Sequence, residues 1–291
     1  MGSFVGSVCT VRRRYLSCRG RVSPIDALAL SVCVLVVIIA VIGPWIAPYD
    51  PYSVDLAGAL HPPSWSHPMG TDSNGRDVAS RVLAGARITL SATAIVLAIT
   101  CVIGVTVGTL SALCGRYIDE ILMRITDIGL AVPSLVLGLG FAVAMGPGIT
   151  STVIAIAATW WPGYARLVRA SINDIRSSGY IESSIALGVG SWRLAIRHIL
   201  PNALGIMYIQ VTLDVAAVML VISGLSFVGV GAQVPSAEWG AMIAGAANNI
   251  ENGWWALVFP GAVMAITAIA FSLSGDWLRV RRDPTLRTGV R

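Results

Sequence analysis

Six long apolar segments constrain the fold of this chain more than any other feature of its sequence. A helix that crosses the hydrocarbon core of a bilayer needs about 20 apolar residues, and each segment is about that long. Because helices satisfy their own backbone hydrogen bonds in lipid, we expect an all-α integral membrane protein with six transmembrane helices. The segments run from about Ile25 to Ala47, Ile88 to Leu113, Ile121 to Met145, Ile149 to Val168, Gly205 to Val228 and Trp255 to Leu278.

The composition agrees with a membrane protein and excludes several chemistries. Only 12% of the residues are charged, against about 25% in a typical soluble domain. All 20 basic residues are arginine, so the chain lacks the lysine that a Walker A ATP site or a Schiff base requires. The five cysteines form no CxxC pair, which argues against a disulfide framework or a zinc site.

The first apolar segment follows an arginine cluster, a pattern that also describes a secretory signal peptide. Its apolar run is longer than the roughly 7–15 residues typical of such peptides. No clear Ala-x-Ala cleavage site follows it. We therefore expect a retained membrane helix.

The arginines are distributed unevenly between the loops. Seventeen lie in the two tails and in or just beside the loops between segments two and three and between segments four and five. The other three are Arg76, Arg81 and Arg87, between the first two segments. An excess of arginine marks the cytoplasmic side, so both termini are predicted to be cytoplasmic. Nothing aromatic interleaves the arginines, so nucleic-acid binding is not expected.

The longest cytoplasmic segment, from about Arg166 to Leu204, is predicted to form helix, turn and helix. Residues 179–187 make two helical turns, in which Ile181 and Ile185 share a face. Gly188 follows where a left-handed residue would end this helix.

A second short helix is expected over residues 192–199. Ser191 can cap it, and Pro201 would end it because proline lacks a backbone donor. A short amphipathic helix that projects from a membrane domain suits insertion into a groove on another protein. The alternative is a helical hairpin lying on the membrane surface.

This loop resembles the EAA loop of ABC-importer permeases. The resemblance rests on Glu182, on Gly188 six residues later, and on the sequence His-Ile-Leu-Pro-Asn at 198–202. The loop carries that family's coupling helix, which docks on the cytoplasmic ATPase. Ser183 and Ser184 stand where the family usually has alanine, but serine is also small and docking should survive. The resemblance implies ATPase coupling through Ile181, Glu182, Ser183, Ser184, Ile185, Leu187 and Gly188.

The outer loop narrows the resemblance to a subfamily. Residues 67–90, which begin His-Pro-Met-Gly-Thr-Asp-Ser-Asn-Gly-Arg-Asp, resemble the entry segment of the C-type permease of dipeptide and oligopeptide importers. Three later stretches fit the same family: 224–229, 238–242, and Trp254-Trp255 followed by Pro260-Gly261. The match runs from about Ser23 to Leu278.

The resemblance implies a type I ABC-importer permease fold that forms half of a pathway for di- or oligopeptides. The chain would catalyse nothing covalent and hold no cofactor, with ATP and Mg on partner subunits. The implied partners are a homologous permease in a heterodimer, two ABC ATPase subunits or domains, an extracytoplasmic binding protein, a peptide and membrane lipid. The implied location is the bacterial plasma (inner) membrane.

Other functions stay open at this point. The same architecture imports nickel complexes or glutathione. An ion-coupled secondary carrier would want several intramembrane acids and often an internal repeat, whereas this sequence has one deep acid and no repeat. An intramembrane protease is disfavoured because all three histidines lie outside the apolar segments.

These patterns divide the chain into four regions. Residues 1–24 form a cytoplasmic tail, and residues 25–86 form the first transmembrane helix with its extracytoplasmic loop. Residues 87–278 form a five-helix permease core that includes the coupling loop 166–204. Residues 279–291 form a second cytoplasmic tail.

The outer loop also has a purely structural interpretation. Thr71 and Asp72 can cap a helix, and Arg76 and Arg81 can pair with Asp72 or Asp77. The alternative is contact with an extracellular binding protein or with the partner permease.

Asp127 and Asp214 fall within apolar segments, where charges are rare and often functional. Asp127 is expected to pair with Arg124 near the cytoplasmic end of its segment. Asp214 lies deeper, and Gln210 is one turn before it on the same face. Both are candidate pathway residues, although Asp214 can instead pair within the bundle or contact a partner subunit.

Small residues recur in the second and third segments. Gly104 and Gly108 have the small-xxx-small spacing that permits close helix packing. We expect a helix–helix contact there and no site.

Overall fold

A computed structural model describes residues 23–179, 181, 194, 197 and 199–282. In this part of the chain the regular elements are helices, and the only β-type pairing is an isolated bridge between Thr71 and Asp77. The long helices are α2 (Pro24–Ile46), α3 (Val78–Leu113), α4 (Arg116–Ala131), α5 (Ser134–Met145), α6 (Ile149–Arg176), α9 (Leu200–Phe227) and α12 (Trp255–Arg282). The short ones are η1 (Leu56–Gly58), α10 (Trp239–Ala246), η3 (Ala247–Asn249) and α11 (Ile250–Gly253).

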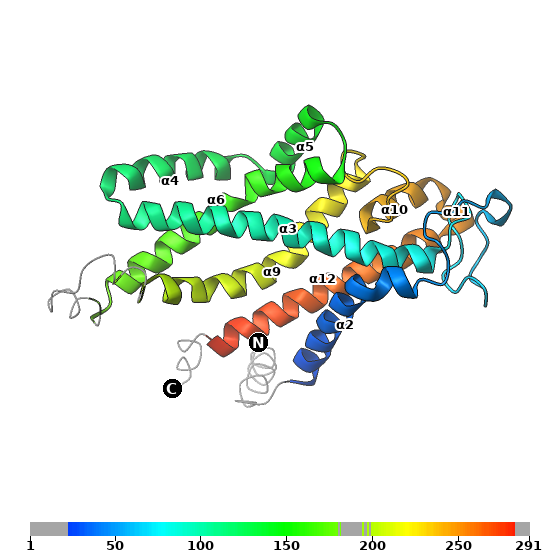
Figure 1. Cartoon of the computed structure of the whole chain (residues 1–291), viewed down its shortest axis with the longest axis horizontal. Coiled ribbons are helices and arrows are strands. Elements are labelled where there is room, and N and C mark those ends of the chain that lie inside the picture. Colours follow the sequence, from blue (N-terminus) through cyan, green and yellow to red (C-terminus); the bar gives the residue numbers. More distant parts are fainter. Residues whose placement is uncertain (1–22, 180, 182–193, 195–196, 198, 283–291) are drawn as a thin grey trace, which may run out of the picture.

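The long helices lie side by side in one elongated bundle (Figure 1). α3 packs against α6, α2 and α9, and α12 packs against α9 and α2. The short helices α10 and α11 gather at one end of the bundle with the loop between α2 and α3 (Figure 1). α2 begins and α12 ends away from that end.

Four helices, α2, α3, α9 and α12, are long and apolar enough to cross a membrane. The third expected span, from Ile121 to Met145, was wrongly predicted as one continuous helix. It consists of α4 and α5, which meet at 92°. Val132 is extended (φ −101°, ψ 131°) because the ring of Pro133 disfavours helical backbone at the preceding residue.

The fourth expected span is present as α6, but this helix extends two turns beyond its predicted end. Arg166, Arg169 and Arg176 lie in its second half. By length and composition, the described residues hold four helices that can cross a membrane, or five if α4 and α5 make one broken span. The count of six therefore stays a prediction.

Capping residues explain where three of the helices begin. Ser23 and Asp26 form a capping box around Pro24 at the start of α2. α3 begins ten residues before its apolar segment because Asp77 accepts a hydrogen bond from the Ser80 backbone. Pro201 lies in the first turn of α9, where its missing N–H would be unpaired anyway. Pro201 thus opens a helix, and the expected helix over 192–199 that it would end lies mostly outside the described residues.

Glycine allows α3 and α6 to approach closely, as the spacing predicted. A Cβ on Gly108 would lie 2.5 Å from the Ala165 carbonyl oxygen and 2.8 Å from Val168 Cβ. A Cβ on Gly104 would overlap the Cβ of Tyr164. Tyr164 and Val168, on the α6 side of this contact, belong to a buried cluster shared by α3, α6 and α9.

Candidate functional site

The predicted coupling segment follows α6. Of its seven residues only Ile181 is within the described part of the chain, where it is fully buried and its N–H donates to the Ser178 carbonyl at 3.0 Å. Ile181 belongs to the buried cluster that also includes Val168 and Ile172 of α6. It therefore anchors the start of the segment to the bundle. Outside the described residues, so still predictions, lie Glu182, Ser183, Ser184, Ile185, Leu187 and Gly188.

Polar contacts connect the C-terminal half of α6 to α3 and α4. Arg169 donates from Nε and Nη2 to the two oxygens of Asp119, at 2.5 and 2.6 Å. The Ser111 hydroxyl donates to the same carboxylate, and Arg176 donates to the Ala112 carbonyl at 2.7 Å. These contacts position the end of α6, after which the predicted coupling segment follows in the sequence.

Asp127 does not pair with Arg124 as expected. It accepts a hydrogen bond from Arg166 of α6 at 2.5 Å, and both side chains are about half exposed. The packing of α6 on α4, which the sequence could not reveal, supplies this partner. An open groove of about 300 Å³ lies over these charges. Its lining consists of Arg116, Asp119, Glu120, Met123, Arg124, Asp127 and Arg169.

The polar strip predicted on α9 is confirmed as a contact. Gln210 Nε2 donates to Asp214 Oδ1 at 3.1 Å, and both residues are partly buried. Tyr164 of α6 is close enough to Asp214 to interact electrostatically. The hydroxyl of Tyr164 is buried and lies near this carboxylate. The middle of the bundle thus holds a carboxylate, an amide and a buried phenol hydroxyl close together.

Asp72 organises the outer loop before α3. Its Oδ1 accepts hydrogen bonds from the backbone N–H groups of Asn74 and Arg76, and its Oδ2 accepts one from Arg76 Nε at 2.7 Å. Arg81 Nε lies 3.6 Å from the same Oδ2. The predicted pairing of both arginines with Asp72 is therefore confirmed. Gly75 makes the turn with φ +72°, in a position where a Cβ would overlap the Asp55 carbonyl oxygen.

The expected cap at Thr71 or Asp72 is corrected, because Asp77 caps α3. Asp77 is buried, and its other oxygen lies 2.9 Å from His67 Nδ1. Thr71 instead donates from its hydroxyl to the Gly58 carbonyl at 2.6 Å.

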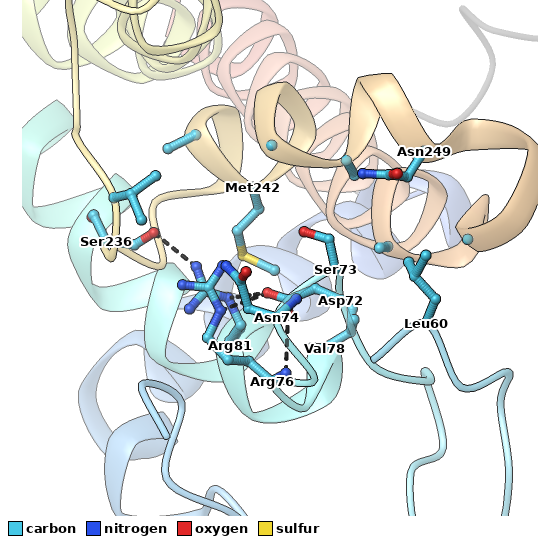
Figure 2. A pocket seen from close by; sticks show the side chains of 16 residues that line it. Leu60, Asp72, Ser73, Asn74, Arg76, Val78, Arg81, Ser236, Met242 and Asn249 are labelled. Carbon is cyan, nitrogen blue, oxygen red and sulfur yellow. Dashed lines mark hydrogen bonds and ion pairs between the residues drawn. The ribbon is translucent and has the colours of Figure 1, made fainter. Parts of the chain in front are cut away.

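A cavity of about 210 Å³ lies between this loop and α10, η3, α11 and α12; we call it the outer pocket. Figure 2 shows Arg76 and Arg81 beside Asp72, with Met242 and Asn249 contributed from the opposite side. Arg81 donates through its Nη atoms to the carbonyls of Pro51 and Ser236, both at 2.9 Å. This pocket could not be predicted from the sequence, because its two walls lie more than 150 residues apart in the chain.

Glu238 and Trp239 hold the far wall of the outer pocket against the bundle. The fully buried Glu238 carboxylate accepts hydrogen bonds from the Ser223 hydroxyl at 2.9 Å and the Ala241 N–H at 2.8 Å. Trp239 Nε1 donates to the Val82 carbonyl at 3.1 Å. In the sequence, Glu238 and Trp239 stood out only because the stretch 238–242 resembles the family. Within the described part of the chain, no three His, Cys, Asp or Glu side chains gather as metal ligands.

Comparison with protein families gives two matches. Residues 104–288 match binding-protein-dependent transport system inner membrane components. Residues 27–63 match the N-terminal transmembrane domain of oligopeptide transport permease C.

Three curated relatives are similar over most of their length. A probable D,D-dipeptide transport system permease of Escherichia coli K12 is 41% identical, over 90% of this chain and 88% of that protein. A di/tripeptide transport system permease of Pseudomonas aeruginosa is 37% identical, over 88% of this chain and 86% of that protein. A nickel transport system permease of Escherichia coli K12 is 34% identical, over 90% of this chain and 94% of that protein.

Among solved structures, an inward-facing MetNI methionine ABC transporter chain resembles this fold with a TM-score of 0.57. The two chains are 20% identical, and the match covers 70% of this chain and 97% of that one. At this identity the similarity concerns the fold alone. The family match and the relatives together show that this chain belongs to the binding-protein-dependent transport system inner membrane components, a family of multi-pass inner-membrane permeases.

Proposed function

We propose that this chain is a permease subunit of an ATP-driven ABC importer and forms half of the translocation pathway for di- or oligopeptides. One observation carries the proposal, the 41% identity to a D,D-dipeptide permease over 90% of the chain. Such a subunit carries out no covalent chemistry.

The proposed topology has six membrane spans and two cytoplasmic termini. α2, α3, α9 and α12 supply four spans, α4 with α5 supplies a broken one, and α6 supplies the sixth. The arginine excess supports the orientation. The same topology supports the division into tails at 1–24 and 279–291, an entry region at 25–86 and a core at 87–278.

The proposed energy source lies on partner chains. The sequence has no lysine for a Walker A site, so two ABC ATPase subunits or domains would bind ATP and Mg. The coupling residues 181–188 would dock on them. The buried anchor at Ile181 and the Arg169–Asp119 pair support this role, because they give the segment a rigid base.

The remaining partners follow from the same proposal. A homologous permease would supply the other half of the pathway, and an extracytoplasmic binding protein would deliver the peptide. ATP binding would draw the two coupling segments together and switch the cavity from inward to outward access. Gln210 and Asp214 are proposed to line the pathway, because they place polar groups in the middle of the bundle.

Nickel complexes are the second candidate cargo, favoured by the 34% identity to a nickel permease. A growth test separates the two cargoes. A bacterial strain that lacks its own peptide permeases and requires alanine would express this chain with its cognate subunits. Growth on L-Ala-L-Ala or D-Ala-D-Ala supports peptide cargo. Nickel-dependent urease activity without dipeptide growth would replace peptide with nickel.

A further inference from the structure

The outer pocket carries a surplus positive charge. Of its 16 lining residues, Arg76 and Arg81 are positive and Asp72 is negative. Their side chains are only 9%, 4% and 14% exposed. A buried charge without a counter-ion is unfavourable, so this arrangement favours a bound anion.

The existing hydrogen bonds leave one arginine with donor groups that can bind an anion. Both Asp72 oxygens already accept hydrogen bonds, and the Arg81 Nη atoms donate to backbone carbonyls. Among the residues that the structure describes, Arg76 donates side-chain hydrogen bonds only through Nε, and Nη1 and Nη2 make none. Since Arg76 lines the cavity, its two terminal nitrogens can offer a donor pair to a planar anion.

The size and charge of the pocket define the class of ligand. Its volume of about 210 Å³ is below the roughly 300–1,000 Å³ that hold a whole drug-sized molecule, so it suits one end of a ligand. A carboxylate carries the single negative charge that balances the surplus, whereas a dianionic phosphate would reverse it. Asn74 and Asn249 add amide groups, and Met242 and Leu60 add apolar surface for a side chain.

We infer that the outer pocket binds the C-terminal carboxylate of a peptide, through Arg76, before the peptide enters the bundle. The inference rests on the proposed peptide-importing function. A free C-terminal carboxylate is common to unmodified peptides whatever their side chains, so this contact would select peptides without selecting their sequence.

The test is a binding measurement on the purified transporter complex in nanodiscs, without binding protein. The probes are Ala-Ala and Ala-Ala-amide, which differ only in the terminal carboxylate. We expect Ala-Ala to bind about tenfold more tightly than the amide, in line with one charge-assisted contact. Arg76→Gln should abolish this difference, and Arg76→Lys should reduce it if the glutamine variant does not fold.

Arg87→Gln is the matched control. Arg87 lies on the same side of the chain but outside the pocket, where its exposed side chain stacks on Trp45. This variant should keep the preference for Ala-Ala. Equal binding of peptide and amide by the wild type would overturn the inference, as would an unchanged preference in both folded Arg76 variants.

Two further readouts separate this inference from the proposed function. ATP-driven uptake of Ala-Ala with no carboxylate preference in the binding assay would overturn the pocket inference alone. A wild-type complex that takes up no peptide would overturn the proposed function instead. If Arg76→Gln weakens docking of the binding protein equally with Ala-Ala and with the amide, the pocket serves an acidic protein side chain and the inference is wrong.

Discussion

Arg169 of α6 binds Asp119 of α4 through two parallel hydrogen bonds, although the residues are 50 positions apart. The pair joins the C-terminal part of α6 to the helix beside it. The segment proposed to meet the ATPases begins one helical turn after α6 ends. A rigid α6 end is what such a segment needs to transmit force into the bundle.

Replacing Arg169 with glutamine should weaken the contact between α6 and α4. We expect a stability loss of about 1 kcal/mol, a modest value because the pair is about one-third exposed. Thermal unfolding in detergent measures it. Arg124→Gln is the control, because exposed Arg124 on α4 has no ion-pair partner among the described residues. An equal change of the unfolding midpoint in both variants would show that the Arg169–Asp119 pair does not stabilise the bundle.

Adding a side chain between α3 and α6 should be far more harmful. Gly108→Val forces the helices apart, and overpacking of this kind costs about 1–3 kcal/mol. Gly163→Val, on α6 with nothing within 4 Å of its Cβ position, is the control. Expression and unfolding midpoint are the readouts. A Gly108 variant as stable as the Gly163 variant would contradict the close contact.

The sequence predicted the helical elements better than their ends and bends. The lengths of the apolar segments alone predicted α2 and the first residue of α12 correctly. Pro133 was visible in the sequence, yet a proline can kink a membrane helix or break it, and apolarity does not distinguish the two. α3 begins ten residues before its apolar segment because Asp77 caps it there, and apolar length cannot reveal a polar first turn.

Contacts between distant segments were mostly beyond the reach of the sequence. Periodicity placed Gln210 and Asp214 on one face, and their hydrogen bond confirms that placement. Asp127 pairs with Arg166 on another helix. This contact could not be predicted, because spacing within one segment does not reveal which helix packs against it. The outer pocket combines Arg76 with Asn249 for the same reason.

Glu238 should be essential to the stability of the far wall of the outer pocket. Glu238→Ala leaves the Ser223 hydroxyl and the Ala241 N–H without their buried acceptor. Such a loss costs about 1–3 kcal/mol for each unsatisfied group. Glu251→Ala, at an exposed position of α11, should change the unfolding midpoint little. If the Glu238 variant unfolds at the wild-type temperature, the buried hydrogen bonds do not stabilise this wall.

Asp214 should matter for transport more than for folding. Asp214→Asn keeps the shape of the side chain and removes its charge, and we expect uptake to fall about tenfold, the effect of one charge-assisted contact. Thr212→Val is the control on the same helix, because its hydroxyl only bonds back to the Tyr208 carbonyl. Uptake at the wild-type rate in Asp214→Asn would exclude it from the pathway.

Gly188 should be required for coupling. A β-branched residue is disfavoured in the left-handed turn proposed there, so Gly188→Val should insert normally yet transport poorly. Ser183→Ala keeps a small, helix-favouring residue and should transport as well as the wild type. Normal transport by Gly188→Val would count against the proposed turn.

Glu182→Gln should lower peptide-stimulated ATP hydrolysis, and unaltered hydrolysis would remove that residue from the coupling role.

The most direct test is the initial rate of dipeptide uptake into liposomes that contain this chain, its partner permease and the ATPase subunits, with binding protein outside. The account predicts uptake only when ATP and Mg are present at the ATPase side, and none when this chain is omitted. Uptake that proceeds at the same rate without ATP, or without this chain, would contradict it.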